Sequence, residues 1–169
     1  MSEFSVRVLS EAEWELYREM RLRALRESPE AFVADIATEE DYDEQLWRDR
    51  MNRSDRMICY SGDDPVGIAS VRMNEALFEN AAELFSLWIS PSLRGEGLAA
   101  KLVVAASELA EKKGASQLVY WVGTDNARAV AFASSYGFRP TEHRREPRTE
   151  SARSEGIEEE LAMVLALRR

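Results

Sequence analysis

The chain has 169 residues, of which 45% are apolar and 31% charged, a balance typical of one compact domain with a sizeable core. With 22 Lys and Arg against 31 Asp and Glu, the net charge of -9 argues against a broad nucleic-acid surface. No apolar stretch approaches the roughly 20 residues of a membrane-spanning helix, and the N-terminus lacks a secretory layout. We therefore expect a cytoplasmic protein with neither a nucleic-acid nor a membrane partner.

The single cysteine and the single histidine give no site of their own. Cys59 lies in the apolar run MICY, which predicts a buried strand thiol, and one cysteine permits no internal disulfide. His143 lies in a charged stretch, which predicts a solvated loop side chain. Because no cysteine and histidine residues cluster, we expect no metal site.

The first third of the chain predicts one strand and two helices. Alternation in FSVRVL predicts a strand at residues 4–9, and Ser10 with Glu13 forms a capping-box pattern at the start of a helix. A second helix is expected from about Glu40 to Met51. Acids gather at residues 35–49, which predicts a solvated helix face or, as the sharper alternative, an acidic rim that attracts an amine.

Strands and helices alternate through the rest of the chain. The patterns predict a hairpin with strands at 57–61 and 66–73 around the turn GDDP, an apolar central strand at 82–90, a helix from Gly97 to the stop at 112–114, a strand at 116–122, a short helix at 126–136, a long polar loop at 141–158 and a final strand at 160–167. This order favours a single α/β (α+β mixed sheet) domain over residues 1–169.

The stretch SPSLRGEGLAAKL, residues 90–102, leads from a strand through a glycine-rich turn into a helix. Such a turn brings backbone N–H groups to the positive end of the helix dipole, where phosphate binds. Gly95 and Gly97 would let the backbone approach phosphate oxygens, and Arg94 adds a charged donor. An ordinary tight connection is the alternative.

Two stretches resemble the motifs of one family. LWISPSLRGEGLAAKLV closely resembles motif A of the GNAT superfamily of N-acetyltransferases, Q/R-x-x-G-x-G/A, with Arg94, Gly97 and Ala99 in the matching positions. NARAVAFASSYGF resembles motif B, with these residues in register: Asn126, Ala129, Phe132, Gly137 and Phe138. Two motifs in this order make the resemblance specific, and it covers most of the chain.

The resemblance implies a GNAT-like acyl-CoA N-acyltransferase fold, in which helices flank a central mixed sheet with a splayed central strand. It also implies acetyl-CoA as acetyl donor, bound by the backbone of that strand and of the glycine turn. The residues that it assigns to the cofactor are Leu87, Trp88, Ile89, Arg94, Gly95, Glu96, Gly97, Leu98, Ala99 and Asn126.

Catalysis needs a proton acceptor for the amine, a donor to the developing oxyanion and a proton for the thiolate. Family members commonly use a carboxylate on the strand before motif A, for which Glu83 is the nearest candidate; a solvated strand-end residue is its simpler alternative. The backbone N–H of Ile89 is the expected oxyanion donor. Ala133 stands where the family usually has the tyrosine that acts as general acid. Tyr136 is the remaining candidate for this role, and core packing is the alternative role for its side chain. Solvent could also supply the proton.

We therefore expect an acetyl-CoA-dependent N-acetyltransferase that acts by direct transfer on a primary amine of a small molecule or peptide. The missing tyrosine leaves open a catalytically weak or inactive acyl-CoA-binding regulatory module. A third alternative is a protein-interaction module in which the glycine turn is purely structural. Family members often form homodimers, sometimes through the final strand, and the apolar strand at 160–167 would allow that here.

Overall fold

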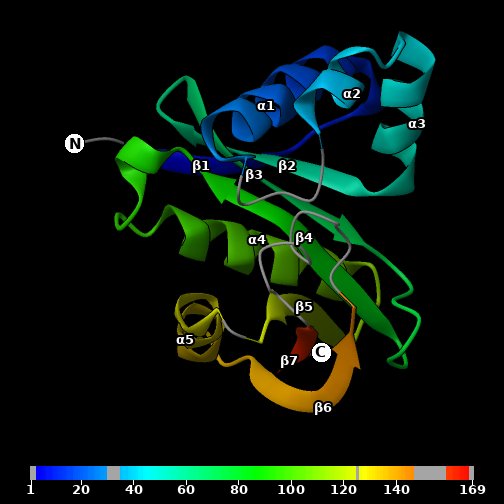
Figure 1. The fold of residues 1–169 in the computed structure, drawn as a ribbon, viewed down its shortest axis with the longest axis vertical. Coiled ribbons are helices and arrows are strands. Elements are labelled where there is room, and N and C mark those ends of the chain that lie inside the picture. Colours follow the sequence, from blue (N-terminus) through cyan, green and yellow to red (C-terminus); the bar gives the residue numbers. More distant parts are fainter. Residues whose placement is uncertain (1–2, 30–34, 125, 147–158, 168–169) are drawn as a thin grey trace. The chain divides into compact units, whose positions relative to one another are not determined.

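The computed structural model describes residues 3–29, 35–124, 126–146 and 159–167 (Figure 1). Its strands and helices are, in chain order, β1 (Phe4–Val8), α1 (Trp14–Glu27), α2 (Ile36–Glu40), α3 (Glu44–Arg53), β2 (Asp55–Ser61), β3 (Asp64–Arg72), β4 (Ala81–Ile89), α4 (Leu98–Lys112), β5 (Gln117–Gly123), α5 (Ala127–Ser135), β6 (Arg139–Arg145) and β7 (Glu160–Ala166). The strands form a seven-stranded sheet in the order β1-β2-β3-β4-β5-β7-β6, in which β4 pairs with β5 in parallel. The predicted mixed sheet and its central strand β4 are confirmed.

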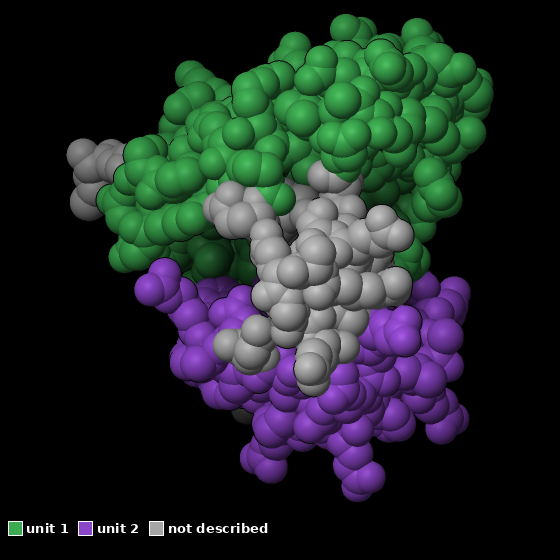
Figure 2. All heavy atoms as spheres, viewed as in Figure 1, with its two compact units in different colours: residues 1–72, 86–106 green, residues 73–85, 107–169 purple. Residues whose placement is uncertain are grey.

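Two compact units divide the chain (Figure 2). Unit 1 comprises residues 1–72 and 86–106, and unit 2 comprises residues 73–85 and 107–169. The boundary between residues 72 and 73 falls directly after β3, and the other two fall inside β4 and inside α4. A single domain over residues 1–169 stays a prediction.

Helices α1, α2 and α3 lie together in unit 1, where α1 packs on β3 and α3 packs on β2 (Figure 1). Their core is a cluster of buried side chains, namely Leu9, Tyr17, Met20, Leu22, Ala24, Leu25, Trp47, Met51, Ile58, Ile68 and Trp88. The capping box predicted before α1 is present, since the Glu13 carboxylate accepts a hydrogen bond from the Ser10 backbone N–H at 3.0 Å.

The single helix predicted from Glu40 to Met51 is wrong in its start. The chain forms two helices here, α2 and α3, separated by residues 41–43. Asp43 begins the second, because its carboxylate accepts a hydrogen bond from the Leu46 N–H at 2.9 Å and caps the helix.

The predicted hairpin is confirmed as β2 and β3, but its turn is shorter than GDDP. Gly62 and Asp63 form the turn, with Gly62 at φ +60, while Asp64 and Pro65 already belong to β3. Cys59 is fully buried in β2, as expected of a core strand thiol.

In unit 2, residues 139–145 form the strand β6, where the sequence predicts the start of a long loop. β6 pairs with β7 in antiparallel register at both ends, with an irregularity between Pro140 and Arg144. His143 is exposed, as expected, but on this strand, and its ring packs edge-on against Phe78 at 4.9 Å. Residues 147–158 of the predicted loop lie outside the described residues.

β7 lies between β5 and β6 in the sheet. Both of its edges are therefore paired, and its apolar sequence reflects burial within the chain. None of the helices in the described ranges has both the length and the apolar character needed to cross a bilayer.

Candidate functional site

Gly95 and Gly97 shape the turn from β4 to α4 in unit 1. Their φ angles of +87° and +84° lie in the left-handed region, which glycine adopts at little cost. A Cβ at either position would meet no heavy atom within 4 Å, and residues 94–97 are exposed. The backbone of the turn therefore lies open to a ligand.

The helix that follows adds backbone donors. The first hydrogen bond of α4 runs from the Lys101 N–H to the Gly97 carbonyl at 3.2 Å. The N–H groups of Leu98, Ala99 and Ala100 precede it, at the positive end of a 15-residue helix whose first turn holds no acid. This end of α4 suits an anion such as phosphate.

Arg94 is tied to the end of β4. Its Nε donates to the Ile89 carbonyl at 3.1 Å, and its Nη2 donates to Ser28 Oγ at 3.0 Å. A guanidinium carries further N–H donors, so these bonds leave it able to reach an anion at the turn. The exposed Glu96 side chain is negatively charged and repels phosphate, so residue 96 would contact a phosphate through its backbone N–H.

The segment Leu87–Ile89 of β4 is held on several sides within unit 1. The indole of Trp88 donates to Ser28 Oγ at 3.0 Å, which joins the strand to the end of α1. Gly67 on β3 permits a close approach, since a Cβ there would lie 2.6 Å from Ile89 Cδ1 and 3.0 Å from the Trp88 carbonyl oxygen. Sequence reasoning missed Ser28, because no motif marks a buried serine.

Ser86 interrupts β4 just before this segment. Its φ of +53° is uncommon for a serine and costs on the order of 1 kcal/mol. The parallel register of β4 with β5 runs from Ala81 to Leu84 and ends before Ser86. Local departures of this kind re-aim backbone and side-chain groups beside active sites.

In unit 2, Glu83 is 4% exposed on β4, so the alternative of a solvated strand-end residue is wrong. The guanidinium of Arg145 lies 3.8 Å from its carboxylate and 2.7 Å from the Glu160 carboxylate. Arg145 also lies over the Trp121 ring, 4.2 Å from its centroid. Sequence reasoning missed Arg145, because it comes from the charged stretch that forms β6.

Asn126 and Tyr136 stand at opposite ends of α5, ten residues and therefore roughly 15 Å apart along the helix. The Asn126 side chain caps the helix by accepting from the Ala129 N–H at 3.0 Å. The Tyr136 ring packs against Phe132 at 5.0 Å. Ala133, at the position of the usual tyrosine, is fully buried. The structure thus does not bring Asn126 and Tyr136 together.

Tyr120 on β5 is a second tyrosine of unit 2, which sequence reasoning did not single out. Its ring packs against Phe138 at 6.1 Å. Burial, with the Glu160 charge adding to it, raises the pKa of Tyr120 to about 12. Its hydroxyl is therefore a weaker acid than that of an ordinary tyrosine.

Comparisons with known proteins agree with the two motifs. The family model described as the acetyltransferase (GNAT) family matches residues 12–138. An uncharacterized N-acetyltransferase of Methanocaldococcus jannaschii is 27% identical over 99 residues, which are 57% of this chain and 44% of that protein. The chain spans less than two thirds of the length of each curated relative that it matches.

Solved structures share the fold. A GNAT-family acetyltransferase of Streptococcus pneumoniae superposes with a TM-score of 0.74 at 17% identity, covering 98% of this chain and 100% of that one. An acetyltransferase of Salmonella typhimurium, solved with its cofactor acetyl-CoA, gives a TM-score of 0.67 at 18% identity, covering 98% and 95%. Because the family match covers most of the chain and contains both the glycine turn and the motif B segment at residues 126–138, this protein belongs to the GNAT family of acetyltransferases.

Proposed function

We propose that this protein is an acetyl-CoA-dependent N-acetyltransferase that moves the acetyl group directly to a primary amine of a small molecule or peptide. The open turn at Gly95 and Gly97 is the observation that carries the proposal. It leaves backbone N–H groups exposed at the start of a long helix, beside Arg94, as a pyrophosphate group requires.

The residues present fit this donor. In the proposal, the N–H groups of residues 95–99 and the Arg94 guanidinium bind the pyrophosphate, and the backbone of Leu87–Ile89 pairs with the pantetheine arm. Asn126 is assigned to the cofactor by its place in motif B, and it acts here by fixing the start of α5.

Each chemical requirement has a candidate residue. Acetyl-CoA supplies a thioester, whose C–S bond breaks as the C–N bond to the amine forms. The Ile89 N–H donates to the carbonyl oxygen as negative charge develops there. Glu83 accepts the amine proton, directly or through water, and Arg145 holds its carboxylate in place.

Tyr136 is the proposed proton donor to the thiolate. Tyr120 is a second candidate, and its raised pKa makes it a weaker acid than an ordinary tyrosine. The buried Ala133 leaves no tyrosine at the position where the family usually has one, and this specific observation favours the alternative of an acyl-CoA-binding module without turnover.

The cellular setting belongs to the same proposal. Cys59 is a free, buried thiol, which suits the reducing cytoplasm. The proposed partner is a small-molecule or peptide amine, and a homodimer would form through a surface other than the paired edges of β7.

The test is acetyl-CoA titration by calorimetry with the wild type, Gly97→Trp and Gly62→Trp. Both glycines have positive φ and open surroundings, so both substitutions impose a similar backbone strain of about 1 kcal/mol or more. Only the tryptophan at 97 would stand over the turn, and we expect it to weaken binding by about 100-fold or more while Gly62→Trp binds as the wild type does.

Turnover is then measured by thiol release with a panel of amines. We expect Glu83→Gln to lower kcat by about 100-fold, and Glu79→Gln, which changes an exposed acid just before β4, to leave it unchanged. Tyr136→Phe and Tyr120→Phe separate the two proton donors. Binding without turnover by the wild type would replace the enzyme with the regulatory module, and absence of binding would refute both.

A further inference from the structure

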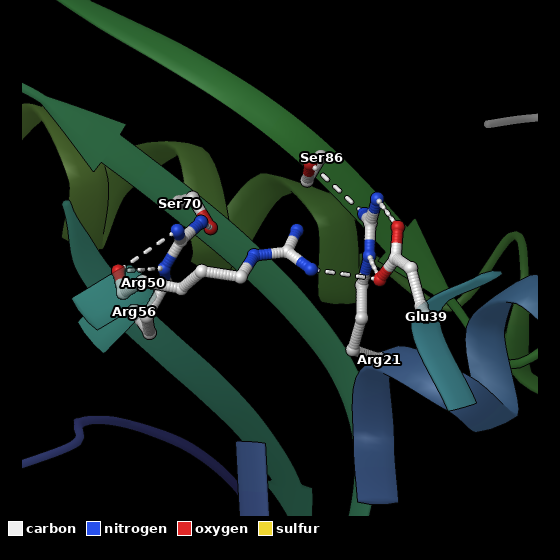
Figure 3. A network of polar contacts seen from close by, with 6 residues as sticks. All are labelled: Arg21, Glu39, Arg50, Arg56, Ser70 and Ser86. Carbon is white, nitrogen blue, oxygen red and sulfur yellow. Dashed lines mark hydrogen bonds and ion pairs between the residues drawn. The ribbon is translucent and has the colours of Figure 1, made fainter. Parts of the chain in front are cut away.

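Ser86, the left-handed residue of β4, is held by a buried network of charged side chains in unit 1 (Figure 3). Arg21 on α1 donates from Nη1 to Ser86 Oγ at 3.3 Å. Its Nε and Nη2 donate to the two carboxylate oxygens of Glu39, each at 3.1 Å. All three guanidinium nitrogens are therefore engaged, in a group that is 6% exposed.

Glu39 is fixed from a second side by α3. Arg50 donates from Nη1 to a Glu39 oxygen at 2.9 Å, and its guanidinium lies over the Trp47 ring at 5.1 Å. Burial alone would raise the pKa of Glu39, but the hydrogen bonds and charges of Arg21 and Arg50 outweigh burial and hold this pKa below its usual range. Helices α1 and α3 thus meet on one ionised carboxylate of α2.

The network ends at the residue that opens the segment Leu87–Ile89. A serine keeps a positive φ inside a strand only where its surroundings impose it. Two residues farther along β4, the Trp88 indole donates a hydrogen bond to Ser28 Oγ at 3.0 Å, and Ser28 directly follows α1. Arg21 and Ser28 are seven residues apart, so the α1 region contacts this stretch of β4 at two points, two helical turns apart.

We propose that Arg21 is a positioning residue, which holds Ser86 in its left-handed conformation and thereby sets the direction of the backbone N–H groups at Leu87–Ile89. Glu39 and Arg50 act behind it, by fixing the plane of its guanidinium. This inference rests on the proposed function, in which the backbone of Leu87–Ile89 pairs with the pantetheine arm and the Ile89 N–H donates to the carbonyl oxygen of the thioester. It gives the acidic segment at residues 35–49 a role in the reaction through Glu39, without contact with substrate.

The test compares Arg21→Met and Ser86→Ala with Arg56→Met. Arg56 is a control of similar burial, because it is 5% exposed and donates to Ser70 Oγ on β3 at 2.7 Å and to the backbone carbonyl of Arg50 at 3.0 Å (Figure 3). We expect Arg21→Met and Ser86→Ala to lower kcat by about tenfold or more, with a smaller rise in the Kd for acetyl-CoA, because the proposed pyrophosphate contacts at the turn are retained. Arg56→Met loses stability and keeps kcat within about twofold.

Arg21→Lys separates charge from geometry. A lysine keeps the charge but cannot bond both Glu39 oxygens and Ser86 at once, so we expect it to be as slow as Arg21→Met. Recovery of kcat by lysine, or an equal loss in Arg56→Met, would overturn the proposal. Should Arg21→Met fail to fold, Ser86→Ala alone decides, because it removes the accepting hydroxyl and little else.

A second measurement does not depend on turnover. If Arg21 holds Ser86 in its left-handed conformation, the amide 1H and 15N shifts of Leu87 and Ile89 move in Arg21→Met, that of Ile89 moves in Ser86→Ala, and both stay in place in Arg56→Met. Unchanged shifts in all three variants would refute the proposal. A wild type with no turnover refutes the proposed function instead, and the amide shifts still report whether Arg21 positions this strand.

Discussion

The Glu39 carboxylate accepts hydrogen bonds from two arginines while it is almost completely shielded from water. Its side chain is 4% exposed, and the side chains of Arg21 and Arg50 are 7% and 14% exposed. Removing one member of such a set leaves the others buried without a matching charge, which costs about 3–5 kcal/mol. Glu39→Gln should therefore weaken folding at neutral pH far more than any change of an exposed acid in the same segment.

The depressed pKa of Glu39 also predicts how stability depends on pH. A carboxylate whose pKa is lower in the folded than in the unfolded chain stabilises the fold above its unfolded pKa, near the ordinary value of 4.5, and loses this effect as pH falls through the folded pKa. We expect urea unfolding at about pH 7 and about pH 4 to show a smaller difference for Glu39→Gln than for the wild type. Equal differences would mean that Glu39 is not the group that titrates.

Helix α3 carries Arg50 and Trp47 into the core, and its start depends on Asp43. Replacing this cap by alanine removes the bond to the Leu46 N–H and should lower the free energy of unfolding by about 1 kcal/mol. Asp43→Ser keeps a capping oxygen and should recover most of that loss. Asp41→Ala controls for the lost charge, since Asp41 is an exposed acid two residues earlier. Equal unfolding midpoints for Asp43→Ala and Asp41→Ala would contradict the cap.

The elements that the sequence predicts correctly carry their own local signals. Ser10 with Glu13 marks the start of the first helical segment, and Gly137 with φ +95° closes α5 as the motif requires. The break before Asp43 was missed, because apolar periodicity continues across it. Within an acidic segment, the pattern does not show whether a given Asp or Glu lies in the interior of a helix or caps its start.

β6 was missed for a different reason. It is the last strand in the sheet order, and its residues are mostly exposed and charged, so the alternation that marks a half-buried strand is absent. Its pairing with β7 joins residues 15 to 25 positions apart, from Arg145 with Glu160 to Arg139 with Val164, which no local pattern reveals. The ion pair of Arg145 with Glu83 follows from that pairing and could not be predicted either, whereas the glycine turn was predictable because glycine adopts positive φ at the lowest cost.

At the scale of the whole chain, net charge is a poor guide to local chemistry. The charge of -9 and the acids at residues 35–49 suggested either a solvated face or a rim for a cation. Glu39 of that segment does neither, since it is buried between two arginines. The network in Figure 3 contains three guanidinium groups and one carboxylate, inside an acidic protein. Which charges a substrate meets is therefore decided by packing rather than by composition.

Cys59 offers a probe of the whole fold, because it is the only cysteine and is fully buried in unit 1, the unit that also contains the glycine turn. Burial raises the pKa of its thiol, so in the folded chain it is both protonated and inaccessible. Alkylation of the Cys59 thiol therefore requires the structure to open first. We expect it to be about 10,000-fold or more slower than in denaturant, as for a domain of ordinary stability.

Acetyl-CoA should slow this alkylation further. If the opening that exposes Cys59 also disrupts the turn at Gly97, ligand at about 100 times its Kd slows labelling by about 100-fold. Gly97→Trp, which lacks the binding, should show no such protection, while Gly62→Trp should show all of it. Fast labelling of the wild type, read by mass spectrometry against a small thiol of known reactivity, would mean instead that β2 opens locally. Protection of Gly97→Trp by acetyl-CoA would mean that the ligand binds elsewhere than at the turn.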